Sequence, residues 1–323
     1  MRRAPYVFEV NAIANAAWVF WTAQGSAAAT TIWQSLVGVA GVATAATIVG
    51  LLIRYVVARR RGHSRRFLRI ISSRSWLIDS ARIFVGLTLL GISYTWTKLL
   101  VPLMHPHLYD QALFDLDRKL FFGSSPSIFF LQLFSAPAFL RFIDLTYAQF
   151  FVGGMLVSFG VFFSSPARRI RIAFMTSSVL MWLVGAWLYV LFPSLGPAFR
   201  FPDVWMPYAP YLRWTQTAQA ILMRNYANVL RMSRGGVAQV FLGMGIAAFP
   251  SLHVATQSLV AIWFNRVWRG GTVIFTAAAF FVFIGSMITG WHYLIDGLAG
   301  VAIAFGSYAV SQWIAKKEFR PSH

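Results

Sequence analysis

Long apolar runs, separated by short polar segments, recur along the whole chain. The first is uncharged from Ile32 to Ile53, and it predicts a membrane-spanning helix over about 30–56. A helix of about twenty mostly apolar residues is long enough to cross the hydrocarbon core of a bilayer. The same pattern predicts further spans at 77–101, 142–163, 172–192, 252–265, 272–289 and from His292 to about Ala315. The expected fold is therefore an all-α, polytopic membrane protein.

Three other segments have the composition of helices that lie along a membrane surface. Residues 1–25 are rich in tryptophan and alanine, and aromatic rings favour the headgroup region. Residues 127–140 are apolar but too short to span, so we expect an interfacial or re-entrant helix within the 102–141 loop. In the long polar loop 193–249, the stretch 215–232 is amphipathic and is predicted to lie on the membrane surface near the functional site.

Charged residues make up only 11% of the chain and are mostly basic, so the formal net charge is +19. Such an excess can indicate a nucleic-acid partner, but here the arginines cluster in short loops between apolar runs. This is the positive-inside pattern of membrane proteins, and it excludes nucleic acid as a partner. The basic segments are 54–74, 168–171, 266–269 and 316–320. They are predicted to be cytoplasmic, and 54–74 could in addition bind anionic lipid headgroups.

Two short motifs near the C-terminal end carry the candidate chemistry. The first is Pro250-Ser251-Leu252-His253, and the second begins at His292 and ends at Asp296. The histidines are separated by about two membrane helices with a tight connection, so both are expected at one membrane face, extracytoplasmic or lumenal. His292 and Asp296 are one helical turn apart, where a carboxylate can bind one imidazole nitrogen and leave the other free to react. Ser251 and the amides after Pro250 offer an anion site at a helix N-terminus.

These motifs resemble those of the type 2 phosphatidic acid phosphatase superfamily, Pro-Ser-x-His and His-x-x-x-Asp. The run 292–300 and the segments 192–199 and 109–123 are similar to its inositol phosphorylceramide synthase branch. The resemblance covers about 76–315 and implies a six-helix catalytic membrane domain there. The chain would then divide into 1–75, with the N-terminal interfacial helix, the first span and the basic loop, a catalytic domain at 76–315, and a basic cytoplasmic tail at 316–323.

The resemblance also implies a role for each motif residue. His292 would be the nucleophile that carries a phosphohistidine, and Asp296 would orient it. His253 would be the general acid that protonates the leaving oxygen, while Ser251 would help to hold the phosphoryl group.

Two cationic motifs of the superfamily are missing from this chain. Ser286 stands where an arginine usually precedes the nucleophile, and Pro193–Arg200 occupies the place of a segment that usually holds a lysine and an arginine. The phosphate must then be bound by other cations. The predicted substrate-binding candidates are Arg200, which adjoins a Gly-Pro turn, Arg231 and Arg234.

The resemblance to the inositol phosphorylceramide synthase branch implies transfer of a phosphorylated headgroup from a phospholipid to a lipid hydroxyl, with a lipid or a polyol as the acceptor partner. One alternative is a phosphatase acting on phosphatidate or polyprenyl phosphates, and a second is a transporter or scaffold with a degenerate site. In each case the partners are membrane lipids. No cofactor and no metal ion are expected, because the sequence places no dense carboxylate cluster near the two histidines.

The acidic part of the 102–141 loop admits two interpretations. His105 and His107, with the neighbouring Asp110, Asp115 and Asp117, could form a metal site. The intervening proline keeps the backbone extended, which favours a solvated loop instead. Asp144, further along, either contacts substrate or faces a helix N-terminus.

Overall fold

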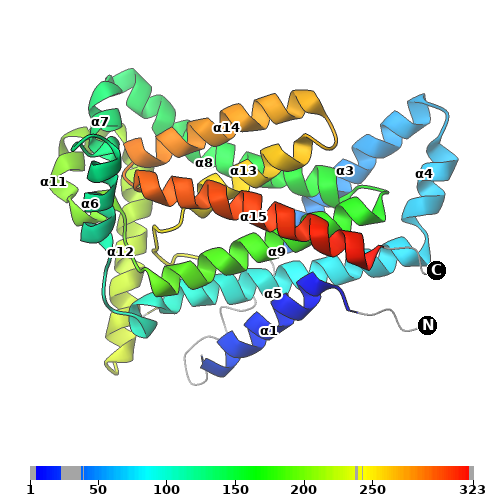
Figure 1. The fold of residues 1–323 in the computed structure, drawn as a ribbon, viewed down its shortest axis with the longest axis horizontal. Helices are drawn as coiled ribbons and strands as arrows, with labels where there is room; N and C mark the ends of the chain where they lie inside the picture. Colours follow the sequence, from blue (N-terminus) through cyan, green and yellow to red (C-terminus); the bar gives the residue numbers. More distant parts are fainter. Residues whose placement is uncertain (1–4, 23–37, 39, 237–238, 242, 320–323) are drawn as a thin grey trace. The chain divides into compact units, whose positions relative to one another are not determined.

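The computed structural model describes residues 5–22, 38, 40–236, 239–241 and 243–319, and its regular elements within these ranges are helices (Figure 1). The predicted all-α, polytopic membrane class is therefore confirmed. Within the described residues, six helical segments are long and apolar enough to cross a membrane. They are α3 (Gly41–Arg60), α5 (Arg74–Met104), α8 (Pro137–Ser158) continued by the π-helical turn η2 (Phe159–Phe163), α9 (Arg168–Leu191), α14 (Arg269–Ile288) and α15 (Leu294–Glu318).

One predicted span is shorter than expected. The helix at 252–265 is α13 (Leu252–Phe264), whose 13 residues fall short of the length that crosses a bilayer. It is nevertheless apolar and almost wholly buried, and it forms a hairpin with α14. The first predicted span is seen as α3, while residues 30–37 and 39 of that prediction lie outside the described residues.

Shorter helices account for the segments predicted to lie at the surface. The helix expected at 1–25 is α1 (Val7–Thr22), and the amphipathic stretch is α12 (Arg213–Ser233). Within the predicted 102–141 loop lie α6 (Asp110–Leu120) and α7 (Pro126–Leu133). The single helix predicted at 127–140 is wrong, because α7 ends at Leu133 and residues from Pro137 onward belong to α8. The remaining short helices are α4 (Ser64–Ile71), α10 (Pro197–Arg200), α11 (Pro202–Trp205) and the 3-10 helix η3 (Met206–Tyr211).

The chain forms two compact units. The first comprises 1–93, 153–183 and 306–323, and the second comprises 94–152 and 184–305. The proposed division at residues 75 and 315 follows the sequence motifs rather than this clustering, and it stays a prediction.

Buried ion pairs connect the helices of the first unit. The carboxylate of Asp79 on α5 accepts hydrogen bonds from Arg168 Nε (2.6 Å) and from the Tyr6 hydroxyl (3.0 Å). Arg82, one turn further along α5, forms an ion pair with Glu9 of α1. Because an isolated buried carboxylate is costly, these partners stabilise the packing of α1 and α9 against α5.

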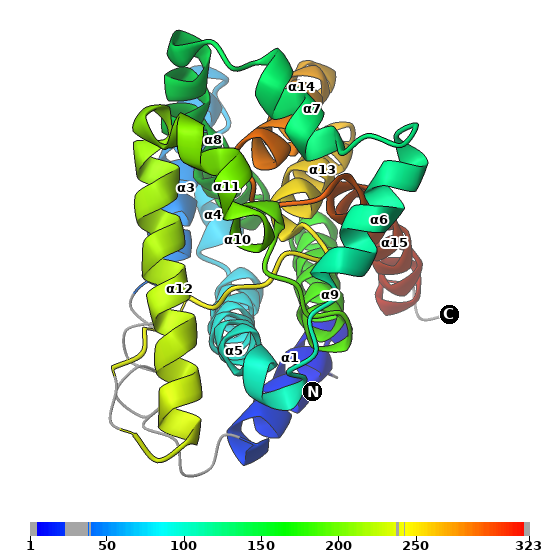
Figure 2. The ribbon, with the colours of Figure 1, turned by 90° about the vertical axis from the view of Figure 1, so that its left-hand side faces the viewer.

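The second unit contains both histidine motifs. Figure 2 shows α12 on one side and α6 on the other side of the segment that leads into α13. An apolar core that includes Leu140, Trp205, Leu212 and Ile288 lies beneath the short helices of this unit. The indole of Trp205 donates to the main-chain oxygen of Ile288 (2.9 Å), so the 193–212 segment is fastened to the C-terminal end of α14.

Candidate active site

The start of α13 positions His253. Ser251 is the N-cap of this helix, and its hydroxyl accepts a hydrogen bond from the amide of Val254 (3.3 Å). The Ser251 amide donates in turn to the main-chain oxygen of Asp296 (2.9 Å). The two motifs are therefore hydrogen-bonded to each other through their backbones. The predicted contact of Ser251 with a phosphoryl group stays a prediction.

The close approach of α13 to α15 requires a glycine. A Cβ atom at Gly300 would lie 2.4 Å from the main-chain oxygen of Ser251, well inside van der Waals contact. Any side chain at this position would separate the two helices and, with them, the two motifs. The Gly300 of the conspicuous run 292–300 is thus explained by packing.

His292 lies immediately before the first turn of α15, two residues ahead of the helix itself. Its Nδ1 atom is 3.3 Å from Asp296 Oδ2, which also accepts a hydrogen bond from the amide of Tyr293 (2.9 Å). Its Nε2 atom is 3.1 Å from Nδ1 of His253. These contacts are all satisfied when both rings are neutral and carry their proton on Nδ1. Burial, reinforced by the ammonium group of Lys98, holds the pKa of His292 well below its usual value.

Both imidazoles line a cavity of about 390 Å³ within the second unit. The ring of His253 packs edge-on against the rings of Phe151 and Tyr147 on α8. The opposite wall comes from α12 and from the 243–247 segment. The walls of the cavity are therefore mainly apolar, and the two histidines line it together with a few other polar or charged residues.

A model of the PAP2 superfamily matches residues 111–310, a range that includes both histidine motifs. The chain belongs to the PAP2 superfamily. Members of this superfamily are phosphatases or phosphotransferases, and the match supports this general type of activity on lipid phosphates. The comparisons with curated proteins and with solved structures gave no match.

The match to the PAP2 superfamily begins within α6, and this helix contacts the first residues of α15, next to His292. The carboxylate of Asp117 accepts hydrogen bonds from the amides of Leu294 (2.7 Å) and Ile295 (2.9 Å), the first residues of α15. A carboxylate at a helix N-terminus also interacts favourably with the helix dipole. Burial raises the pKa of Asp117 to about 7, and the two amide hydrogen bonds oppose that shift. Asp117 therefore fixes where α15 begins, and so where His292 lies.

Asp110, one and a half to two turns earlier on α6, braces a second segment of the site. Its carboxylate accepts from the amides of Leu195 (2.9 Å) and Gly196 (2.8 Å) and from the Tyr293 hydroxyl (3.0 Å). Burial raises the pKa of Asp110, against these hydrogen bonds. Carboxylates of the acidic segment thus hold the main chain of the 195–196 segment and of the start of α15 in place. Neither sequence interpretation included this role. Among the described residues, no group of three or more His, Cys, Asp or Glu side chains could hold a metal ion.

Glycine is required where the 193–200 segment meets the loop that carries His292. Gly196 has φ +106°, and a Cβ atom there would lie 2.5 Å from the main-chain oxygen of Trp291. The next segment is fastened by a hydrogen bond from the Ala198 amide to the oxygen of Gly290 (3.0 Å). In this PAP2 protein the segment that replaces the first cationic motif therefore packs directly on the His292 loop.

Lys98 is the functional candidate that sequence reasoning missed. It lies on α5 and lines the same cavity as His253 and His292, with its ammonium group 5.3 Å from the ring centre of Tyr189. It is the charged residue of the run 83–101, near the C-terminal end of α5. A charged residue in an apolar run is itself a signal of function, since a charge in the membrane region is costly.

The three predicted arginines lie elsewhere in the second unit. Arg200, Arg231 and Arg234 are exposed and are not among the residues that line the cavity. Their predicted role in substrate binding stays a prediction. Asp144 lines the cavity, but its carboxylate accepts from the amides of Trp214 (2.9 Å) and Thr215 (2.8 Å), so it caps the N-terminus of α12.

Replacing Asp117 with alanine is expected to lower turnover and to reduce the free energy of unfolding by about 1–3 kcal/mol, because two amides of α15 lose their acceptor. Asp117→Asn keeps one acceptor and should give an intermediate effect. Asp115→Ala is the matched control, since this carboxylate is exposed on the same helix and bonds only to the side chain of Gln111. Thermal unfolding in detergent and lipid turnover measure the two effects. Equal behaviour of the Asp117 and Asp115 variants would contradict the bracing role.

Proposed function

We propose that this chain is a membrane phosphotransferase that moves a phosphorylated headgroup from a phospholipid to a lipid hydroxyl by way of His292, as in inositol phosphorylceramide synthases. The observation that carries the proposal is the series of contacts from Asp296 to His292 to His253 at the wall of a cavity that also holds Lys98. This group of residues contains a nucleophile with an orienting carboxylate, a second imidazole for proton transfer and a cation for the phosphate.

In the first step, Nε2 of His292 attacks the phosphorus atom of the donor lipid. A P–N bond forms, and the P–O bond to the departing diacylglycerol breaks. The bound phosphate must enter between the two rings and replace their mutual contact of 3.1 Å. Its negative charge then favours a protonated His253, which gives its proton to the departing oxygen. Asp296 stabilises the positive charge that develops on the ring of His292.

The nonbridging oxygens of the phosphoryl group require cationic or hydrogen-bonding partners. Lys98 is the basic residue that lines the cavity, and its ammonium group supplies the charge. The hydroxyl of Tyr147, which also lines the cavity, is buried and has no hydrogen-bond partner among the described residues. It is therefore available to donate to the same oxygens.

In the second step, the acceptor hydroxyl attacks the phosphohistidine, the P–N bond breaks, and His253 takes up the hydroxyl proton. The sequence similarity of 292–300 to synthases supports a lipid acceptor. So does the apolar lining of the cavity, in which Phe151, Trp214 and Leu222 disfavour water next to His292. Hydrolysis is the same second step with water in place of the lipid hydroxyl.

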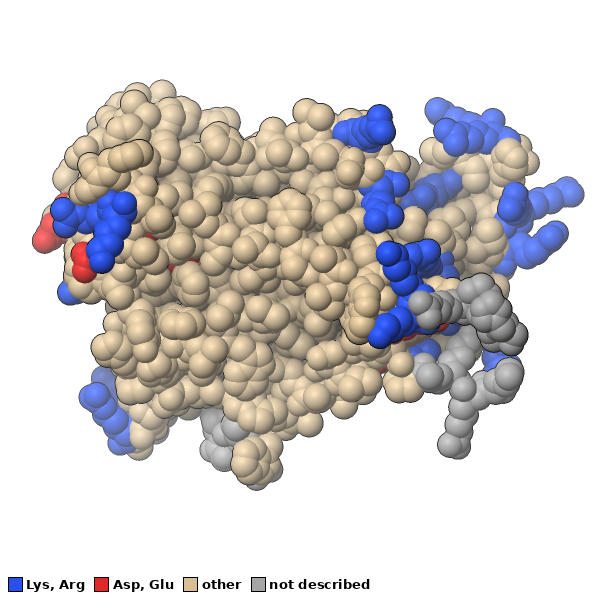
Figure 3. All heavy atoms as spheres, viewed as in Figure 1, with Lys and Arg blue, Asp and Glu red and all other residues tan. Residues whose placement is uncertain are grey.

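The site is proposed to lie on the extracytoplasmic or lumenal side of the membrane. Lysines and arginines of the first unit gather where α4 and the C-terminal end of α15 lie, at the right of Figure 3. The last turn of α15 carries Lys316 and Lys317, and His292 precedes its first turn. A helix of 25 residues is about 37 Å long, enough to place its two ends at opposite membrane faces. The positive-inside rule makes the lysine end cytoplasmic.

The test uses purified protein in liposomes that contain phosphatidylinositol and other phospholipids, with and without ceramide or diacylglycerol. Free phosphate and new lipid species are followed together, with His292→Ala as control. A new headgroup-bearing lipid that requires His292 is the expected result. Phosphate release alone would make the protein a lipid phosphatase. Identical products from wild type and His292→Ala would mean that the site assignment is wrong, and no product from wild type would leave a transporter or scaffold as the function.

A further inference from the structure

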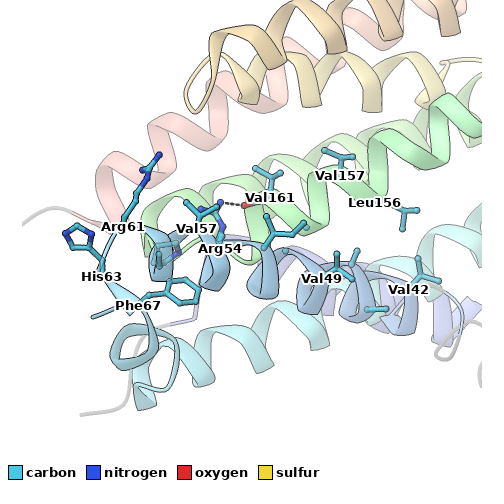
Figure 4. A pocket seen from close by; sticks show the side chains of 17 residues that line it. Val42, Val49, Arg54, Val57, Arg61, His63, Phe67, Leu156, Val157 and Val161 are labelled. Atoms are coloured by element: carbon cyan, nitrogen blue, oxygen red, sulfur yellow. Dashed lines mark hydrogen bonds between the residues drawn. The ribbon is translucent and has the colours of Figure 1, made fainter. Parts of the chain in front are cut away.

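A groove of about 960 Å³ lies within the first unit, between α3 and the C-terminal end of α8 with η2 (Figure 4). Its walls are almost entirely aliphatic, and both bounding helices are membrane spans. The aliphatic residues include Val42, Val49, Ile53, Leu156, Val157 and Val161. A methylene group is about the size of a water molecule, which occupies about 30 Å³ in the liquid, so the groove has room for the acyl chains of one phospholipid.

The two helices meet through glycines. A Cβ atom at Gly50 would lie 1.9 Å from the main-chain oxygen of Gly160, so the backbones of α3 and η2 are in direct contact there. Close to this crossing, Ala45 and Ala46 line the groove with small side chains. Arg54 then fastens α3 to η2, with its guanidinium donating to the oxygen of Val161 (2.7 Å) and to the Ser164 hydroxyl (2.9 Å). These contacts fix the position of α3 against η2, and so they define the shape of the groove between the two helices.

One end of the groove is basic. Figure 4 shows Arg61, His63 and Phe67 at the end where α3 stops, away from Val42 and Leu156. Arg61 and His63 are exposed, and none of the residues that line the groove is acidic. The neighbouring turn of α3 adds Arg59 and Arg60. An apolar channel along a membrane helix that ends at exposed basic residues complements a lipid with a negatively charged headgroup.

We propose that this groove is a binding site for an anionic phospholipid, with its acyl chains along α3 and α8 and its phosphate at Arg61 and His63. The site is separate from catalysis, because neither His253 nor His292 lines it. The bound lipid serves the fold, since it covers aliphatic side chains of α3 and supplies an anion for the basic end. Arg61 contributes a charge-assisted hydrogen bond to the phosphate, and the aliphatic walls contribute burial of the chains.

Native mass spectrometry of the purified full chain, delipidated and titrated with phosphatidylglycerol or phosphatidylcholine, tests the site. Wild type is expected to retain phosphatidylglycerol on the order of ten-fold more tightly than phosphatidylcholine, the scale of one charge-assisted hydrogen bond. Arg61→Gln should remove most of that preference. Arg65→Gln is the matched control, because it removes the same charge from exposed α4 without lining the groove. Ala46→Phe, which fills the groove, should weaken retention of both lipids.

Three outcomes would overturn the proposal: equal retention of the two lipids, an equal loss in Arg61→Gln and Arg65→Gln, or unchanged retention in Ala46→Phe that elutes as a folded monodisperse species. The second would show a diffuse attraction to the basic loop instead of a site. Lipid retention is read separately from turnover, and His292→Ala should bind phosphatidylglycerol like wild type. Failure of the groove and failure of the catalytic proposal are thus distinguishable.

Discussion

Replacing His292 with alanine is expected to abolish turnover, by at least about 10⁴-fold, while the protein remains folded. The nucleophilic nitrogen is lost, and removal of a catalytic nucleophile costs rate on this scale. The fold should tolerate the change, because the side chain borders a cavity and its side-chain contacts are to the site residues Asp296 and His253. Turnover of a labelled phospholipid in liposomes, with thermal unfolding measured in parallel, checks both parts. His107→Ala is the matched control, since this histidine is exposed and lies outside the cavity lining.

The His253 variant separates the two histidine roles. His253→Ala should retain more activity on a lipid phosphate with a good leaving group than on one with an alkoxide leaving group, because only the alkoxide needs a proton from an acid. Labelling quenched with alkaline detergent, under which the P–N bond of a phosphohistidine survives, should trap a phosphorylated protein in wild type and none in His292→Ala. Labelling that persists without His292 would place the nucleophile elsewhere. Equal losses on both leaving groups would remove the acid role of His253.

Replacing Lys98 with methionine is expected to lower kcat by about 10²–10³-fold, the usual cost of losing one group that stabilises transition-state charge. Methionine is unbranched and fills the apolar part of the lysine site, so packing against Tyr189 should survive. The effect should fall on kcat more than on KM, because charge on the nonbridging oxygens shifts during the reaction. Lys98→Arg keeps the charge and should recover part of the rate. Steady-state kinetics on all three proteins measure the differences.

Arg200→Met provides the comparison that decides which cation acts on the phosphate. Arg200 is exposed and lies outside the cavity lining, so its loss should change kcat less than five-fold, in the range of about 1 kcal/mol seen for exposed charges. Arg231→Met and Arg234→Met extend the test to the other two predicted arginines. An Arg200 variant as impaired as Lys98→Met would favour the arginine that the sequence motif placed nearest the site.

The membrane class could be predicted from the sequence because hydropathy and helix length are local properties. A run of apolar residues such as 272–289 has one stable form in a bilayer, a helix whose backbone satisfies its own hydrogen bonds. The two histidine motifs could also be found in the sequence. In the second, the short spacing from His292 to Asp296 brings the side chains of these two residues together within one turn. The superfamily match over 111–310 agrees with the assignment made from these motifs.

Only the tertiary structure decided which groups surround the histidines. Lys98 is on α5, far from both motifs in sequence, and its approach to them depends on how α5 is rotated about its own axis. That rotation is set by packing with several helices at once, which no local pattern encodes. From the sequence, Asp117 is either a solvated or a metal-binding carboxylate. In the fold it accepts hydrogen bonds from two main-chain amides of α15. The sequence by itself determined the long apolar helices and the contact of His292 with Asp296. The other partners of His292 and His253 came from contacts between distant segments, because burial and hydrogen bonding are properties of the folded chain as a whole.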